Sequence, residues 1–349
     1  MCDPCVVDDR VVPPERDADV PGFTALLGIP GLADVHTHFL PPRMLRRVWA
    51  YFDEGGPLIG TRWPIRYRWS DEERVAHLAA MNVRMFSALA YAHRPGMAAD
   101  LNTWTLSFAR KTRGCLASAT FFPESGVTGY VTKALDDGAR IFKVHFQVGG
   151  FSPADPLLDP VWDVLAATGT PVVMHAGHAP VGTEHTGPGP VSQVLKRHPA
   201  LTAIVAHLGA PDYAEFLRLA AAHDRVMLDT TMVFTDFFDQ LAPFPRAVLP
   251  QLKDLGDAGK ILLGSDFPNI PYPYARQIAA LAGLGLGDPW LRAVCWENAV
   301  AMFGVPAEDV ARGLDDGYVP ESRADRHFAR CAGKTRNSLR YEGYDARRP

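Results

Sequence analysis

The sequence predicts an α/β protein with a (β/α)8 barrel, the TIM-barrel architecture. Three observations support this prediction. Short apolar runs alternate with helical patterns, the runs number eight, and five of the eight end at a potential metal ligand or acid/base group. Strands that alternate with helices predict a parallel sheet, and eight such repeats close naturally into a barrel. A doubly wound open sheet is the alternative architecture.

Eight apolar runs predict the strands. Each run is short and rich in β-branched or other apolar side chains, which is typical of strands buried on both faces. In chain order the predicted strands are Ala33–His36, Val83–Leu89, Leu116–Phe121, Ile141–His145, Val172–His175, Ala203–His207, Val226–Leu228 and Ile261–Leu263.

Helical patterns of apolar residues lie between these runs and after the last one. In chain order the predicted helices are Asp71–Met81, Met97–Thr112, Gly126–Asp136, Pro160–Ala167, Pro190–Arg197, Pro211–Ala221, a broken stretch over Phe234–Leu255, Pro273–Ala282 and Pro289–Phe303.

The domain organisation follows from these elements. We expect a catalytic barrel over residues 29–305, with an insertion loop at about residues 51–70 after the first strand. An acidic extension at residues 1–28 precedes the barrel, and an extension at residues 306–349 with a basic end follows it. Both ends are typical of poorly packed segments, or of arms that fold over the body.

Composition limits the classes of partner. The 349 residues are 47% hydrophobic and carry a net charge of -4, which argues against nucleic acid or an anionic membrane as the main partner. No stretch approaches the roughly 18 apolar residues of a transmembrane helix. The first residues lack the basic and apolar regions of a signal peptide, so we expect a cytoplasmic protein.

Potential metal ligands and acid/base groups follow the predicted strands. In a (β/α)8 barrel the active site lies at the carboxyl ends of the strands. Residues two apart on a strand share a face, so both histidines of the first strand could bind one ion. The polar residues at these ends are His36 and His38 on strand one, Lys143 and His145 on strand four, His175 on strand five, His207 on strand six and Asp266 after strand eight.

These residue types predict a metal centre. Three neutral imidazoles and one carboxylate suit a divalent ion, so we expect His36, His38, His175 and Asp266 to hold one metal. We expect Zn²⁺, and Mn²⁺ or Fe²⁺ also suits these ligands. A metal with an open position lowers the pKa of water, and Asp266 would take the proton. His207 would polarise a carbonyl or stabilise developing negative charge.

Several ordered motifs cover most of the chain between Gly31 and Gly304. They are Asp34-Val-His-Thr-His-Phe-Leu-Pro-Pro42, Phe142-Lys-Val-His145, Pro171-Val-Val-Met-His175-Ala-Gly177, Ala206-His-Leu-Gly209, Leu263-Gly-Ser-Asp-Phe-Pro268, Glu297-Asn-Ala299 and Phe303-Gly304. Together they resemble the amidohydrolase superfamily, in particular the branch with aminocarboxymuconate-semialdehyde decarboxylase and related metal-dependent hydrolases. The resemblance implies the same four ligands, with His207 as the acid/base or carbonyl-polarising residue. Some relatives, including several aromatic-acid decarboxylases, have glutamate where this chain has His36.

Other residues are candidates for substrate contact. In some superfamily branches a strand-four lysine is carboxylated and bridges two metals, whereas Lys-Val-His resembles the single-metal branch. We therefore expect Lys143 to be an ammonium near the barrel mouth, with the bridging role as the alternative. His145 and His178 would contact substrate or serve structure only. Arg62 and Arg66 could clamp a carboxylate, or lie on a solvated loop that its aromatic residues anchor.

The sequence therefore predicts a metal-dependent hydrolase that acts on a small-molecule substrate through metal-activated water. A carboxylate substrate would suit the basic residues. A metal-dependent decarboxylase of a small unsaturated or aromatic acid is the alternative, and a non-catalytic ligand-binding barrel is the second alternative. Relatives are often dimers, so a homodimer is also considered.

Overall fold

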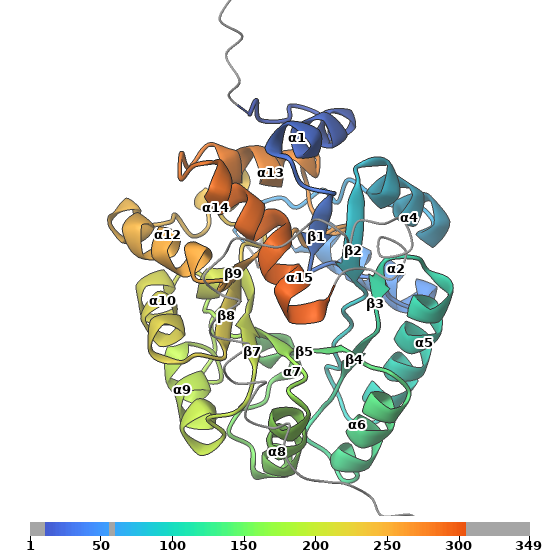
Figure 1. Cartoon of the computed structure of the whole chain (residues 1–349). Helices are drawn as coiled ribbons and strands as arrows, with labels where there is room; N and C mark the ends of the chain where they lie inside the picture. The colour runs from blue at the N-terminus through green and yellow to red at the C-terminus, as the bar shows by residue number, and fades with distance from the viewer. Residues whose placement is uncertain (1–10, 56–59, 305–349) are drawn as a thin grey trace, which may run out of the picture.

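Parallel strands form the inner layer of the fold and helices surround them (Figure 1). The computed structural model describes residues 11–55 and 60–304. Its strands are β1 (Leu32–Asp34), β2 (Val83–Ser87), β3 (Cys115–Leu116), β4 (Ser118–Thr120), β5 (Ile141–His145), β6 (Val172–His175), β7 (Ala203–Val205), β8 (Val226–Asp229) and β9 (Ile261–Leu262).

The strands pair in chain order to form a closed ring. Strands β1 to β3 form one parallel set and β4 to β9 another. Only Ala117 separates β3 from β4, so these two segments act as one barrel strand, and the nine described segments make eight barrel strands. The last strand meets the first through the Val35 N–H, which donates to the Leu263 carbonyl at 2.9 Å. The (β/α)8 barrel is therefore confirmed.

The predicted strand runs all overlap observed strands. Strands β5 and β6 have the predicted bounds, because every residue of β6 and all but one of β5 are buried. The sixth run ends earlier than predicted, at Val205, because His207 and Leu208 have φ angles of 55° and 51° in a tight turn. The His207 N–H donates to Asp229 Oδ1 at 3.0 Å and holds this turn.

Helices cover the outside of the barrel (Figure 1). The α-helices are α1 (Val20–Leu27), α2 (Pro42–Glu54), α4 (Asp71–Ala80), α5 (Ala98–Lys111), α6 (Val127–Asp136), α7 (Phe146–Gly149), α8 (Asp159–Thr168), α9 (Pro188–Arg197), α10 (Tyr213–Ala222), α11 (Asp236–Asp239), α12 (Leu249–Asp257), α13 (Ala275–Ala282), α14 (Asp288–Arg292) and α15 (Asn298–Phe303). The 3-10 helical segments are η1 (Asp17–Asp19), η2 (Pro156–Leu158), η3 (Ala206–Gly209) and η4 (Arg246–Val248), and η5 (Ala293–Glu297) is a π-helical segment.

Helix α4 shows how local sequence sets an element boundary. Ser70 precedes the helix, and its hydroxyl accepts from the Glu73 N–H at 3.2 Å. The Glu73 carboxylate in turn accepts from the Ser70 N–H at 2.8 Å. This reciprocal cap satisfies two backbone donors and stabilises the first turn, where three acidic residues also suit the helix dipole.

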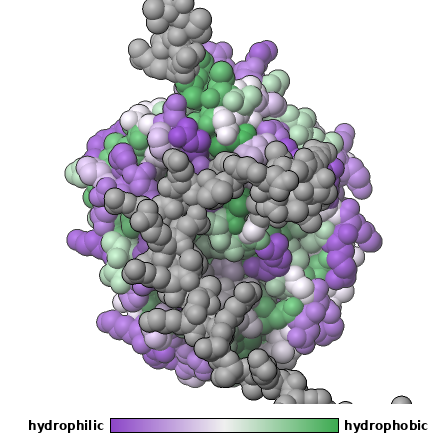
Figure 2. Space-filling view, viewed as in Figure 1, coloured by the Kyte–Doolittle hydropathy of each residue, from purple (hydrophilic) through white to green (hydrophobic). Residues whose placement is uncertain are grey.

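The described part of the N-terminal extension packs on the barrel. In α1, Val20, Phe23 and Leu27 are buried, whereas Leu26 is exposed. Figure 2 shows hydrophobic residues at the surface near the top of the molecule, where α1 lies in Figure 1. The Asp17 carboxylate accepts hydrogen bonds from Tyr67, His77 and the backbone of Ala275. The extension from residue 306 onward lies outside the described residues.

The insertion after β1 begins with a helix that the sequence did not predict. Residues 42–54 form α2, so the predicted loop at 51–70 starts inside a helix, and residues 56–59 lie outside the described ranges. None of the helices in the described ranges has the length and apolar character of a membrane-spanning segment.

Candidate functional site

A cavity of about 880 Å³ opens at the carboxyl ends of the strands. This volume lies in the range of small-molecule sites. The polar residues on its inner wall are His36, His38, Lys143, His145, His175, His207 and Asp266.

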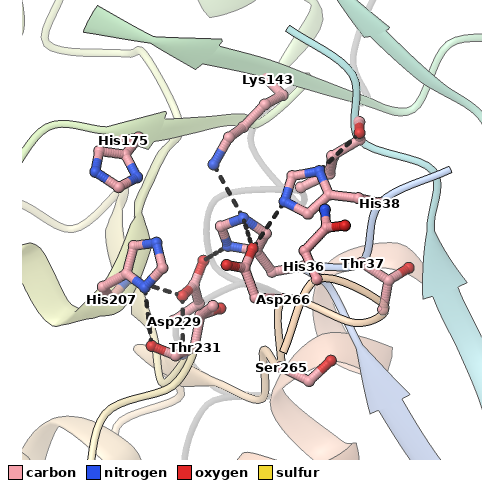
Figure 3. Close-up of polar contacts among 12 residues, drawn as sticks. His36, Thr37, His38, Lys143, His175, His207, Asp229, Thr231, Ser265 and Asp266 are labelled. Carbon is pink, nitrogen blue, oxygen red and sulfur yellow. Dashed lines mark hydrogen bonds and ion pairs between the residues drawn. The ribbon is translucent and has the colours of Figure 1, made fainter. Parts of the chain in front are cut away.

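The two histidines that follow β1 present the same ring nitrogen to the cavity (Figure 3). His36 donates its Nδ1–H to Asp229 Oδ2 at 2.8 Å, and His38 donates its Nδ1–H to the Leu89 carbonyl at 2.9 Å. Each hydrogen bond fixes the ring orientation and leaves Nε2 as the atom that can bind a cation.

Asp266 lies opposite these two nitrogen atoms. Its Oδ1 is 2.8 Å from His38 Nε2 and 3.5 Å from His36 Nε2. The ligand atoms of the three residues all lie within 4.8 Å of one another. Since the Nδ1–H of His38 is already used, its short Nε2 contact with a carboxylate requires a shared proton or a metal cation. The donor set therefore fits a divalent ion.

A buried carboxylate connects the backbones of the two segments that carry these residues. Asp34 accepts from the His36 N–H at 3.1 Å, from Ser265 Oγ at 2.5 Å and from the Tyr274 hydroxyl at 3.0 Å. Burial raises the pKa of Asp34 to about 7, even though these hydrogen bonds favour its charged form. Asp34 thereby links the His36 segment to the Asp266 segment.

Lys143 lies beside His36 on the wall of the cavity. It is buried, and its Nζ donates to His36 Nε2 at 3.0 Å. Burial lowers the pKa of Lys143 to about 8. Burial and the neighbouring Lys143 ammonium lower the pKa of His36 to about 4, so His36 is neutral at pH 7, as a metal ligand must be.

Asp266 and Asp229 both stay ionised in this buried site. Burial opposes their charged form, but hydrogen bonds and charges from His38 and His36 hold the pKa of Asp266 far below its usual range. His36 has the same effect on the pKa of Asp229. The site therefore contains two carboxylates that can balance the charge of a cation.

His207 and His175 lie beside the His36–His38–Asp266 group. His207 donates its Nδ1–H to the Thr231 carbonyl at 3.0 Å, which leaves its Nε2 as an acceptor. The His175 ring is 4.8 Å from the His207 ring, and its Nε2 donates to the Ala179 carbonyl at 3.1 Å. Among the described residues, His175 is outside the set of ligand atoms that lie within 4.8 Å.

Comparison with known families fits this geometry. Residues 33–305 match the family model described as Amidohydrolase. The chain belongs to the amidohydrolase family. The superfamily resemblance found in the sequence is thereby confirmed.

Solved structures share the fold of this amidohydrolase. An uncharacterised TIM-barrel protein from Bordetella bronchiseptica is 18% identical, with a TM-score of 0.57 over 81% of this chain and 99% of that one. A 5-carboxyvanillate decarboxylase from Novosphingobium aromaticivorans, complexed with manganese and 4-hydroxy-3-methoxy-5-nitrobenzoic acid, is 13% identical, with a TM-score of 0.55 over 80% and 97%. A dihydroorotase from Campylobacter jejuni is 14% identical, with a TM-score of 0.51 over 79% and 83%. A search of curated proteins found no significant match.

The predicted substrate contacts fall into two groups in this amidohydrolase. Lys143 and His145 line the cavity, and the His145 ring stacks on His175 with 3.8 Å between ring centroids. His178, Arg62 and Arg66 do not line it. His178 instead donates to Asp212 Oδ2 at 2.7 Å.

The loop that carries the two arginines alternates in burial. Trp63, Ile65 and Tyr67 are buried, whereas Arg62, directly before Trp63, and Arg66, between Ile65 and Tyr67, are exposed. Trp63 donates its indole N–H to the Asn269 carbonyl at 2.7 Å. This arrangement matches the alternative of a solvated loop that its aromatic residues anchor.

Some residues that shape the site were not predicted from the sequence. Asp229 orients His36 and holds the His207 turn, and it is the last residue of β8. The predicted strand Val226–Leu228 stopped one residue before Asp229. A carboxylate directly after a predicted strand could therefore have identified Asp229 as a site residue. Three further residues of the cavity wall do not directly follow a predicted strand, because they lie on α2 and on a loop. They are Arg43, Arg47 and Arg94.

Proposed function

We propose that this amidohydrolase is a metal-dependent hydrolase of a small-molecule substrate. His36, His38 and Asp266 would hold one divalent ion, with His175 as the fourth ligand. The proposal rests on one observation: two fixed imidazole Nε2 atoms and one ionised carboxylate converge on a buried point of the cavity wall. Coordination by His175 through Nε2 requires the contact with the Ala179 carbonyl to be given up.

A divalent ion bound there supplies a Lewis acid and lowers the pKa of a water molecule. Zn²⁺ suits the nitrogen-rich donor set, and Mn²⁺ is the alternative. The Asp266 carboxylate, ionised and next to His38, would accept the proton of the attacking water. The same group would then return this proton to the leaving group.

His207 would act at its Nε2 atom. Its Nδ1–H is committed to the Thr231 carbonyl, and burial lowers its pKa, so the neutral ring offers a lone pair to the cavity. This geometry favours proton acceptance by His207. Stabilisation of an oxyanion would first require His207 to gain a proton.

Decarboxylation of a small unsaturated or aromatic acid is the second candidate. Lys143 favours it, because its buried Nζ places positive charge on the inner wall where a carboxylate would bind. The fold similarity to the 5-carboxyvanillate decarboxylase is consistent with it. In that reaction His207, once protonated, would deliver a proton to carbon.

Metal analysis and a substrate screen test the proposal. Purified protein should contain about one divalent ion per chain, and a His36→Ala/His38→Ala variant should lose it. Lactones, amides and unsaturated carboxylic acids should then be screened for hydrolysis and for CO₂ release. CO₂ release without hydrolysis would select the decarboxylase, and full metal occupancy in the double variant would refute the ligand assignment.

A further inference from the structure

The outer part of the cavity wall carries a cluster of basic side chains that the proposed reaction does not use. Arg43 and Arg47 come from α2, and His93 and Arg94 come from the loop between β2 and α5. We call these four residues the rim cluster. Arg43 and Arg47 are four residues apart and therefore share one face of α2. Partial burial and, to a smaller extent, the positive charges of Arg94 and Arg47 lower the pKa of His93.

Among the described residues, little negative charge compensates the rim cluster. Apart from Asp266 at the inner wall, Asp100 is the one carboxylate of these residues that lines the cavity. Within residues 11–55 and 60–304, no ion pair joins Arg43, Arg47 or Arg94 to a carboxylate. Three exposed guanidinium groups that line one cavity create a positive potential that attracts anions.

Apolar side chains also line the cavity. Among them are Val48, Phe52, Met97, Leu101 and Val148. Such a surface suits the hydrocarbon or aromatic part of a ligand, and a cavity of about 880 Å³ exceeds what a single small carboxylate fills. The cavity wall thus combines a buried polar site, apolar side chains and the exposed basic side chains of the rim cluster.

We propose that the rim cluster binds an anionic group of the substrate that is remote from the reacting bond. The substrate is then an elongated organic acid whose apolar or aromatic body lies against the apolar side chains of the cavity. This inference takes only the reaction at the inner metal site from the proposed function. Arginine suits the rim cluster because its planar donor pairs bind carboxylates in a bidentate way.

Equilibrium binding to the zinc-loaded full chain tests the inference. The probes are two aromatic dicarboxylates of different length, terephthalate and biphenyl-4,4′-dicarboxylate, with benzoate and biphenyl-4-carboxylate as single-charge counterparts. For the better dicarboxylate we expect an Arg43→Gln/Arg47→Gln variant to lose about tenfold in affinity, because two charge-assisted contacts at exposed side chains are together worth roughly that much. Arg46→Gln, the same change at an exposed α2 residue outside the cavity, should change affinity less than about twofold.

The outcomes separate this inference from the proposed function. Dicarboxylate binding that is within twofold of wild type in the double arginine variant would overturn the inference, as would no detectable binding by the wild-type chain. An equal loss in the Arg46→Gln control would also overturn it. The same titrations in the His36→Ala/His38→Ala background test the rim cluster alone. If the chain binds no metal but the arginine dependence persists, the proposed function fails and the rim cluster assignment stands.

Discussion

Replacement of Asp229 by asparagine should reverse the proton position on His36. Asp229 Oδ1 accepts two backbone hydrogen bonds, from His207 at 3.0 Å and Thr231 at 3.1 Å. An asparagine must keep its oxygen at that position, so its NH₂ group would face His36 Nδ1, where Oδ2 now accepts at 2.8 Å. His36 would then have to accept at Nδ1 and carry its proton on Nε2, the atom that should bind the metal.

The expected cost is large for a residue that does not itself touch the metal. Loss of a group that orients a metal-binding histidine costs roughly 10- to 100-fold in metal affinity. Here the substitution also blocks one ligand atom and leaves a donor facing Lys143 Nζ, so we expect the upper end. A loss of about 100-fold corresponds to about 3 kcal/mol of metal-binding free energy.

Competition with a chelator of known zinc affinity would measure this loss. Circular dichroism would establish that the variant is folded. Asp212→Asn is the matched control, because Asp212 also accepts from a histidine Nδ1, that of His178, but outside the cavity. Zinc affinity of Asp229→Asn within threefold of wild type would refute the reasoning.

Three further predictions concern metal content, acid stability and the N-terminal segment. His38→Ala should reduce zinc content well below one ion per chain by elemental analysis, whereas His178→Ala should retain it, because His178 lies outside the cavity lining. The folded-state pKa of His36 is about 4 against 6.5 for a free side chain, so the unfolded metal-free chain binds more protons between these pH values. The free energy of unfolding should therefore fall as the pH drops from 6.5 to 4, with His36 contributing on the order of 3 kcal/mol. Urea titrations at the two pH values measure this, and an equal loss in His36→Gln would contradict it. Asp17→Asn should cost about 1–3 kcal/mol of unfolding free energy, because Asp17 accepts from Tyr67, His77 and Ala275. Asp19→Asn, which affects an exposed pair with Arg16, should change little, and equal effects of the two variants would disprove a role for the Asp17 contacts.

The barrel could be predicted because its strands are buried on both faces. Val172, Val173 and Met174 are fully buried, and such a run has few alternatives to a central parallel strand. Helix α2 was not predicted, although Met44, Val48 and Phe52 recur every four residues and give its sequence a regular apolar face. The strand–helix alternation requires one helix between β1 and β2, and α4 takes that place, so α2 lies in an insertion that the repeat does not predict.

The candidate site was predictable only in part. Strand ends identified His36, His38 and Asp266 because barrel geometry brings those ends together. The pairing of His36 with Asp229 spans 193 residues, and no local pattern predicts it. The ring direction of His175 also depends on Ala179, in a loop whose path the sequence does not specify.

The candidate ligands lie where the two ends of the barrel meet. The Asp266 N–H donates to the His36 carbonyl at 2.9 Å, and the His38 N–H donates to the Phe267 carbonyl at 2.7 Å. A metal ion held by these residues would bind only when the first and last strands are together. By mass action, metal at about 1,000 times its dissociation constant would oppose separation of these strands by about 4 kcal/mol. The same ion would therefore serve as a reporter of barrel closure during folding.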